Sequence, residues 1–186
     1  MQVNDVGDLV VDRPDAIWAL ADPARLTLLD RLRRAAAPIT ATELGGGSGR
    51  HLEELERFGF VSRDASTPPR WSAVGKGIYF EVLEDPAGEA AGRALTRAMV
   101  RQYDHLPRQW AEESEPKLPP EWAQAAGLFN ARVLLTPSEL EWVQGELERL
   151  LAEVLNRGDR DTPADAGPVR LLAYFLPEPN SSVTQR

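Results

Sequence analysis

The chain contains no cysteine, and this absence excludes several kinds of site at once. Without thiolates there is no disulfide, no cysteine-ligated metal and no cysteine nucleophile. Only two histidines, His51 and His105, are present, and they lie far apart in the sequence. We therefore expect no metal site, no cofactor and no catalytic residues, so that the chain is not predicted to be an enzyme.

Long apolar runs are missing as well, since no uninterrupted one is longer than that from Leu171 to Leu176. A helix that crosses a membrane needs about 20 apolar residues. A secretory leader is not indicated either, because residues 1 to 15 carry acids where a leader would carry Lys or Arg. We therefore expect a cytoplasmic protein. The composition, 42% hydrophobic and 27% charged, predicts a folded chain with a core.

The net charge of −8 is unevenly distributed along the chain. Residues 23 to 80 carry nine basic and six acidic side chains, a net charge of +3, whereas residues 81 to 186 carry eleven basic and eighteen acidic ones, a net charge of −7. Nucleic-acid binding depends on a local basic patch rather than on the total charge. A mildly basic first half and an acidic second half indicate two different roles in one chain.

Helix start signals follow one another in the first half. Residues 1 to 12 show no periodicity and are expected to form a flexible arm. Pro14 and the pair Asp22-Pro23 are typical of helix N-termini, because proline fits the first turn and Asp caps free N–H groups. Thr40 and Glu43 have the spacing of a capping box, in which each side chain accepts from the other residue's N–H, so a short helix is predicted there.

A glycine run, Gly45-Gly46-Gly47-Ser48-Gly49, interrupts this helix, because each glycine costs a helix about 1 kcal/mol. We predict an irregular loop in its place. Helical spacing resumes from Arg50 to Phe58, and Gly59 suits the end of a helix. Two short strands, residues 60 to 63 and 70 to 74, enclose a turn-forming stretch and predict a β-hairpin.

The second half mixes helices and strands. A long helical region opens at Asp85-Pro86, and Pro107 is expected to kink it. Thr136-Pro137-Ser138-Glu139 combines a capping box with proline at the first helical position and predicts another helix, whose apolar stripe would pack on the last two strands. The fold class of this half is therefore α+β. Strands are predicted at residues 78 to 83, 129 to 135 and 169 to 176.

The aromatic residues fall into three groups. Trp18 and Trp71 are expected in the core of the first half. Trp142 falls on the polar side of its helix, opposite the leucine and valine stripe, and indicates a contact with another subunit or domain. A third group could line a pocket for a small apolar effector, with plain core packing as the alternative. This group comprises Tyr103, Trp110, Trp122 and Phe129.

Three pieces of the first half stand in the order found in a known family. They are Ala-Leu-Ala-Asp-Pro-Ala-Arg-Leu at residues 19 to 26, the segment Thr40 to Leu44, and the run from Arg50 to Val61. Together they resemble bacterial transcriptional regulators of the ArsR type over about residues 15 to 80. The second half is similar to the acidic C-terminal extension of an actinobacterial subgroup of these regulators.

The resemblance implies a winged helix-turn-helix that binds double-stranded DNA as a homodimer and acts as a repressor. It divides the chain into a flexible arm (1–12), a winged helix-turn-helix domain (13–83), a long helix and linker (84–119), an α+β domain for dimerisation or effector binding (120–178) and a tail (179–186). The expected DNA contacts are Arg50, His51 and Arg57 on the recognition helix, with Arg70 and Lys76 at the wing.

One departure from the family bears directly on function. Between Leu44 and His51 the chain is about seven residues shorter than a helix-turn-helix requires, so the turn and the base-reading half of the recognition helix are missing. Gly-Gly-Gly-Ser-Gly also has the composition of a flexible artificial linker, which leaves an engineered deletion open. Two readings remain: a regulator whose DNA reading is impaired, or a winged-helix remnant that serves as a dimerisation or ligand-binding module without DNA.

Overall fold

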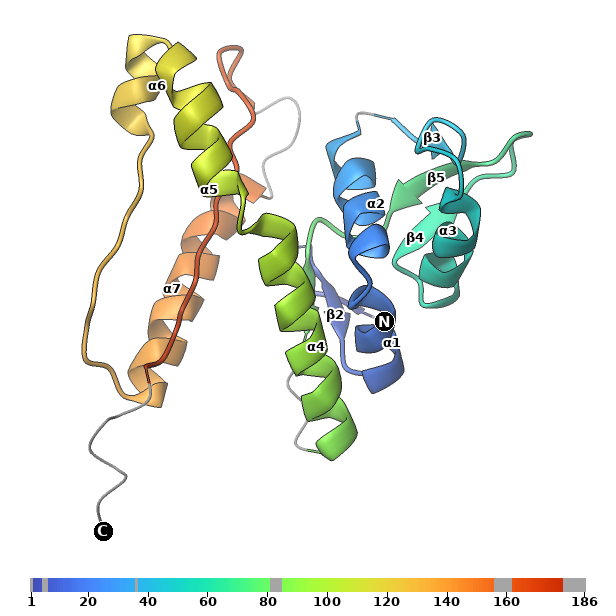
Figure 1. Ribbon diagram of the computed structural model, residues 1–186, viewed down its shortest axis with the longest axis horizontal. Coiled ribbons are helices and arrows are strands. Elements are labelled where there is room, and N and C mark those ends of the chain that lie inside the picture. Colours follow the sequence, from blue (N-terminus) through green and yellow to red (C-terminus); the bar gives the residue numbers. More distant parts are fainter. Residues whose placement is uncertain (1, 5–6, 36, 81–84, 156–161, 179–186) are drawn as a thin grey trace. The chain divides into compact units, whose positions relative to one another are not determined.

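The computed structural model describes residues 2–4, 7–35, 37–80, 85–155 and 162–178 of the chain. These residues form a mixed α+β structure (Figure 1). The chain divides into two compact units, Met1–Asn130 and Ala131–Arg186. Each unit is described by itself below.

The helices of the first unit begin where proline and a capping residue predict. The Asp22 carboxylate accepts hydrogen bonds from the N–H groups of Ala24 and Arg25, and Asp85 does the same for Ala87 and Gly88. These caps satisfy N–H groups that have no partner inside the helix, and the predicted starts are confirmed. The helices are α1 (Pro14–Leu20), α2 (Pro23–Arg34), α3 (Ser48–Arg57) and α4 (Pro86–Tyr103).

The hairpin that the sequence predicts is present and forms part of a three-stranded antiparallel sheet. The sheet is built from β3 (Ile39–Thr40), β4 (Val61–Arg63) and β5 (Arg70–Ala73) in the spatial order β3-β5-β4. Ile39 pairs with Trp71, and Val61 pairs with Ala73. The strand that precedes α3 therefore lies beside the second strand of the hairpin.

Residues near the N-terminus form strands, so the flexible arm predicted for residues 1 to 12 is not what the described residues show. β1 (Gln2–Val3) and β2 (Leu9–Val11) are antiparallel, and β2 pairs in parallel with β6 (Ile78–Phe80). Leu9 and Val11 are almost fully buried. A strand of three residues is too short for an alternating pattern to be recognised in the sequence. Residues 81 to 83 of the strand predicted at 78 to 83 lie outside the described residues.

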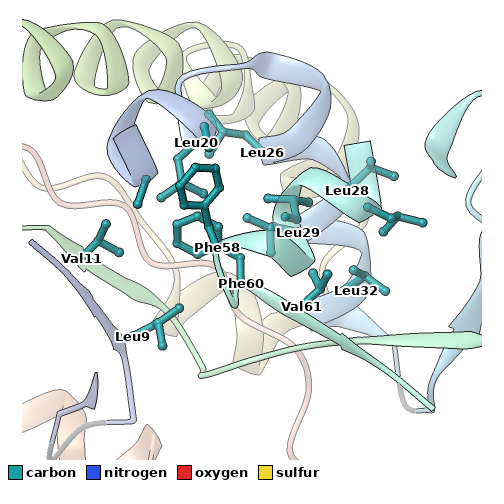
Figure 2. Close-up of a cluster of buried hydrophobic side chains, with 14 of the residues drawn as sticks. Leu9, Val11, Leu20, Leu26, Leu28, Leu29, Leu32, Phe58, Phe60 and Val61 are labelled. Carbon is teal, nitrogen blue, oxygen red and sulfur yellow. The ribbon is translucent and has the colours of Figure 1, made fainter. Parts of the chain in front are cut away.

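One hydrophobic core joins these elements (Figure 2). Leu52 and Leu55 of α3 are fully buried, and each contributes about 1.5 to 3 kcal/mol by leaving water. Trp71 is 3% exposed, which confirms its predicted place in the core. Trp18 is 51% exposed, so the prediction that it belongs to the core is wrong. The buried side of α1 is formed instead by Ala16, Ile17, Ala19 and Leu20.

The helical region after β6 is interrupted near Pro107, as the sequence predicts. α4 ends at Tyr103, and α5 (Leu106–Gln109) begins anew with Pro107 in its first turn, because proline fits a first turn but not a helix interior. The chain then continues through a π-helical turn (Trp110–Ser114), a 3₁₀ turn (Glu115–Lys117) and α6 (Pro120–Ala125).

The second unit is built around α7 (Pro137–Leu155). The predicted capping box is confirmed: Thr136 N–H and its hydroxyl donate to Glu139 Oε2 at 2.7 and 2.8 Å, and Glu139 N–H donates to Thr136 Oγ1. Residues 129–135 and 169–176 belong to no strand of the described chain, so the two strands predicted there are not formed. No residue of α7 is buried. None of the described helices is long and apolar enough to cross a membrane.

The conformation of the glycine run gives a first prediction. Gly47 caps α3 with φ of +91°, and a Cβ there would meet no atom within 4 Å. Gly47→Ala should therefore lower the free energy of unfolding by about 1 to 2 kcal/mol through the backbone alone. Gly46→Ala is the matched control, because Gly46 also faces open space but has no positive φ. Denaturant unfolding of both variants checks this, and equal stabilities would contradict it.

Candidate nucleic-acid interface

Helix α3 places its charged side chains on one side and its leucines on the other. Arg50, Glu53 and Arg57 are exposed, whereas Leu52 and Leu55 are in the core. The amphipathic spacing fixes the rotation of the helix about its axis, because only one face can be buried. The outer face of α3 therefore carries two arginines and one glutamate.

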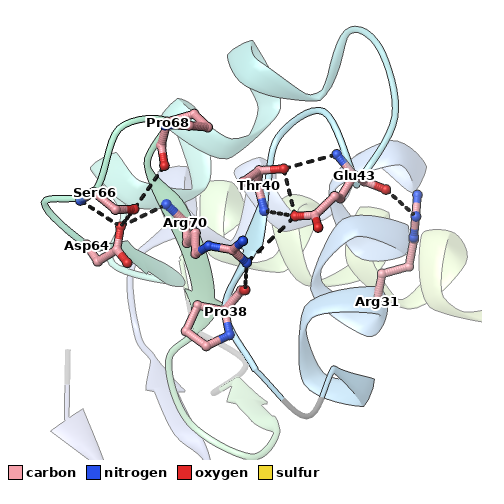
Figure 3. Close-up of polar contacts among 8 residues, drawn as sticks. All are labelled: Arg31, Pro38, Thr40, Glu43, Asp64, Ser66, Pro68 and Arg70. Carbon is pink, nitrogen blue, oxygen red and sulfur yellow. Dashed lines mark hydrogen bonds and ion pairs between the residues drawn. The ribbon is translucent and has the colours of Figure 1, made fainter.

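The segment before α3 is a single turn, although the sequence predicts a short helix from Thr40. The capping box is present: Thr40 N–H and its hydroxyl donate to Glu43 Oε2 at 2.8 and 2.7 Å, and Glu43 N–H donates to Thr40 Oγ1 at 3.2 Å (Figure 3). Leu44 N–H reaches Thr40 O at 3.1 Å, but Gly45 then turns away with φ of +107°. A capping box can start a helix, but it cannot carry one through a left-handed residue.

Arg31 of α2 holds this turn from the opposite end. Its guanidinium donates from Nη1 to Leu44 O and from Nη2 to Glu43 O, the latter at 3.1 Å. Basic side chains commonly satisfy the carbonyls left free at the end of a helical turn. The sequence does not reveal this role, because Arg31 is one of three arginines in the last turn of α2 and nothing in the sequence indicates which carbonyls lie within reach.

The glycine run is a defined turn that leads into α3. Gly45 and Gly47 both have positive φ values, and Ser48 N–H and its hydroxyl both donate to Gly45 O. The first residues of α3 are Ser48, whose side chain is occupied by this hydrogen bond, and Gly49, which has no side chain. Arg50 is thus the first residue of the helix whose side chain extends freely into solvent.

The hairpin tip between β4 and β5 is acidic rather than basic. Asp64 Oδ1 accepts hydrogen bonds from Ser66 Oγ, Ser66 N–H and Arg70 N–H (Figure 3). These bonds, that from the Ser66 hydroxyl first, hold the pKa of Asp64 below its usual value. The Arg70 side chain turns toward β3 and donates to Pro38 O at 2.9 Å, with the Glu43 carboxylate 3.9 Å away.

The five residues predicted to contact DNA do not form one group. Arg50, His51 and Arg57 share α3, and Arg70 is the first residue of β5, next to the hairpin loop. Lys76 lies after β5, where its N–H donates to Gly7 O, so it is placed beside the N-terminal segment and not in the hairpin loop. Among the three on α3, His51 is half-buried, and its Nδ1 has no hydrogen-bond partner among the described residues.

Several arginines of this region are engaged by acids or rings. Arg57 pairs with Glu54 at 3.4 Å, and its guanidinium lies 4.9 Å from the centre of the Phe58 ring. Arg63, which the sequence analysis does not single out, pairs with Glu56 at 3.1 Å and lies over Trp71. These exposed ion pairs contribute little to stability, but they reduce the positive field around α3.

The four residues predicted to line an effector pocket come from different elements: Tyr103 from the end of α4, Trp110 from the π-helical turn, Trp122 from α6 and Phe129 from the extended chain after α6. Tyr103 donates from its hydroxyl to Asp30 Oδ1 of α2, and Phe129 is 94% exposed. A cavity of about 470 Å³ lies elsewhere, between Phe80 and α4. Its other lining residues are Glu89, Gly92, Arg93, Thr96 and Arg97.

Comparisons with family models, with curated proteins and with solved structures give no match for this chain.

The capping box predicts a pH effect. The backbone N–H and hydroxyl of Thr40 hold the pKa of Glu43 below its ordinary value of 4.5. Because the folded state favours the ionised form, Glu43 stabilises the fold above pH 4.5, and this contribution is lost as the pH falls through the lowered folded-state pKa. Glu43→Gln should therefore make the free energy of unfolding less dependent on pH below 4.5 than in the parent.

The control is Glu53→Gln, which removes a carboxylate from the exposed face of α3 and should leave the acid dependence close to that of the parent. Carboxyl NMR titration of Glu43 gives the pKa directly. A midpoint at or above the ordinary glutamate value would contradict the prediction.

Proposed function

We propose that this chain is a cytoplasmic, DNA-binding transcriptional regulator of the ArsR-like winged-helix type, acting as a homodimeric repressor. The order of its elements supports this: two helices, a short strand, a turn, a helix and a hairpin, with the strands arranged β3-β5-β4. In a winged helix-turn-helix the helix before the hairpin enters the major groove. That helix is α3 here.

The position of Arg50 is the observation that carries the proposal. It stands in the first turn of a helix whose inner face is fully buried, and its side chain is exposed. The N-terminal residues of a recognition helix are those that reach the bases and phosphates of the groove. Arg50 would therefore contact DNA first. Arg57 lies farther along the same exposed face of the helix.

The glycine run limits what this helix can read. The three residues before α3 are glycines, Ser48 is bonded to Gly45 O, and Gly49 has no side chain. Direct readout of bases needs side chains that reach the edges of base pairs. Phosphate contacts from arginines fix position but carry no sequence information. Binding should therefore be weak and largely independent of sequence.

The first test is salt-dependent binding to random duplex DNA. We expect a dissociation constant of about 10⁻⁶ to 10⁻⁴ M near physiological salt. Arg50→Ala should weaken binding uniformly across sequences and reduce the slope of log K against log salt by about 1. Arg149→Ala, a substitution on α7, is the control and should change neither. If the parent prefers one operator over random duplex about 1,000-fold, the argument from the shortened helix is wrong.

The second test restores the missing length. Replacing Gly45 to Gly49 by a complete turn and a helix N-terminus of about twelve residues should create sequence preference, because each good bidentate base contact supplies about 1 to 3 kcal/mol. The control is an insertion of equal length made only of Gly and Ser. Sequence preference from the Gly-Ser insertion, or none from the helical one, would contradict the role given to this segment.

A second candidate function is supported by the ion pairs of the same region. Arg57, Arg63 and Arg70 each face a carboxylate, and the hairpin tip carries Asp64. A surface neutralised in this way also suits a winged-helix remnant that serves as a dimerisation or ligand-binding module. A chain that binds no duplex at about 50 mM salt, where phosphate contacts are strongest, would favour this candidate over the regulator.

A further inference from the structure

The cavity beside α4 has the size of a site for a small organic molecule. Its volume is about 470 Å³, and such sites commonly occupy about 300 to 1,000 Å³. Phe80 of β6 lines one part of it. The other lining residues of the described chain follow the i, i+3, i+4, i+7, i+8 spacing of one stripe along α4: Glu89, Gly92, Arg93, Thr96 and Arg97.

Gly92 keeps one part of the cavity wall free of side-chain atoms. It is buried in the middle of α4, yet a Cβ built on it would meet none of the described atoms within 4 Å. Glycine weakens the interior of a helix relative to residues that carry a side chain. This position therefore favours open space over a more stable helix. Phe80, which is half-buried, adds an aromatic surface from β6.

The charged groups of the lining have a positive excess. Arg93 forms an ion pair with Glu89 at 2.9 Å, so these two charges offset each other. Arg97 is exposed and has no ion pair or hydrogen bond with any described residue. Two arginines and one glutamate give the lining a net charge of +1. A guanidinium presents several N–H donors in one plane, and this geometry matches the two oxygens of a carboxylate.

Other classes of ligand fit this lining less well. One carboxylate without a histidine does not provide the ligands that a metal ion needs. A bare inorganic anion would pair with Arg97 but would leave the Phe80 ring and the space at Gly92 in water. A macromolecule cannot enter a cavity of this size. The lining therefore favours a small molecule that has one acidic group and an apolar body.

We propose that this cavity binds a small organic acid, whose carboxylate pairs with Arg97 and whose apolar body lies between Phe80 and α4 at Gly92. The Thr96 hydroxyl also lines the cavity and can donate to the same carboxylate. Burial of the apolar body supplies the hydrophobic part of the affinity, and the arginine selects for the acid. The inference goes beyond the proposed function, and none of its observations involves DNA or a second subunit.

Isothermal titration calorimetry of the full chain tests the proposal with naphthoate and octanoate as aromatic and aliphatic probes. At least one of them should bind with a stoichiometry of one per chain. Naphthamide, the neutral analogue of naphthoate, should bind about 10-fold or more weakly than the acid, because a charged hydrogen bond is stronger than a neutral one. Inorganic phosphate should not compete with either acid.

Arg97→Ala should weaken binding of the acid about 10- to 100-fold and leave binding of the neutral amide nearly unchanged. Arg101→Ala is the matched control, because Arg101 is an exposed arginine one turn farther along α4 and does not line the cavity. Its affinity should equal that of the parent. Equal losses in the two variants would show a general charge effect and would overturn the proposal.

Gly92→Leu should fill the cavity and abolish binding, while its melting temperature stays at or above that of the parent, because leucine is the better helix former. Gly145→Leu on α7 is the control, because its Cβ would also meet no described atom within 4 Å but it does not line the cavity. A lower melting temperature for Gly92→Leu would contradict the open space at this position. Failure of both acids to bind, or competition by phosphate, would also overturn the proposal. DNA is absent from these measurements, so failure here is distinct from failure to bind DNA.

Discussion

The placement of α3 in the first unit depends on the short connection between Leu44 and Leu52. Both leucines lie in one core, and the chain between them must complete a turn and start a helix. Gly45 and Gly47 allow this, because both have φ values that side-chain-bearing residues rarely adopt. The Arg31 guanidinium then holds the turn by donating hydrogen bonds to the backbone carbonyls of Glu43 and Leu44. The direction of α3 and the exposure of Arg50 follow from this connection.

The sequence predicts those parts of the fold that depend on neighbouring residues. Prolines and capping residues locate α1, α2, α4 and α7, because a cap involves only three or four consecutive residues. Pairings between distant segments are missed, as for β2 with β6, since three residues carry too little pattern. The strands at 129–135 and 169–176 are predicted from composition, but composition does not supply a pairing partner.

In the candidate site too, the sequence predicts which residues share an element but not which distant residues contact them. Arg50, His51 and Arg57 are placed on one helix by sequence spacing, and α3 agrees. Whether an arginine is available depends on acids that fold next to it, such as Glu43 in the turn after β3, which lies 3.9 Å from Arg70 of β5. Counting nine basic residues in this half therefore overstates its positive field. Lys76 is separated from the hairpin because its N–H bonds Gly7.

The parallel pairing of β2 with β6 links the two ends of the first folded region. Leu9 lies beside Ile78, so the elements from α1 to β5 are all enclosed in one loop of the chain. Closing so long a loop costs entropy, which the burial of Leu9 and Val11 offsets. This region should thus unfold as a single cooperative body. The strand that precedes α4 in the sequence is therefore held beside β2.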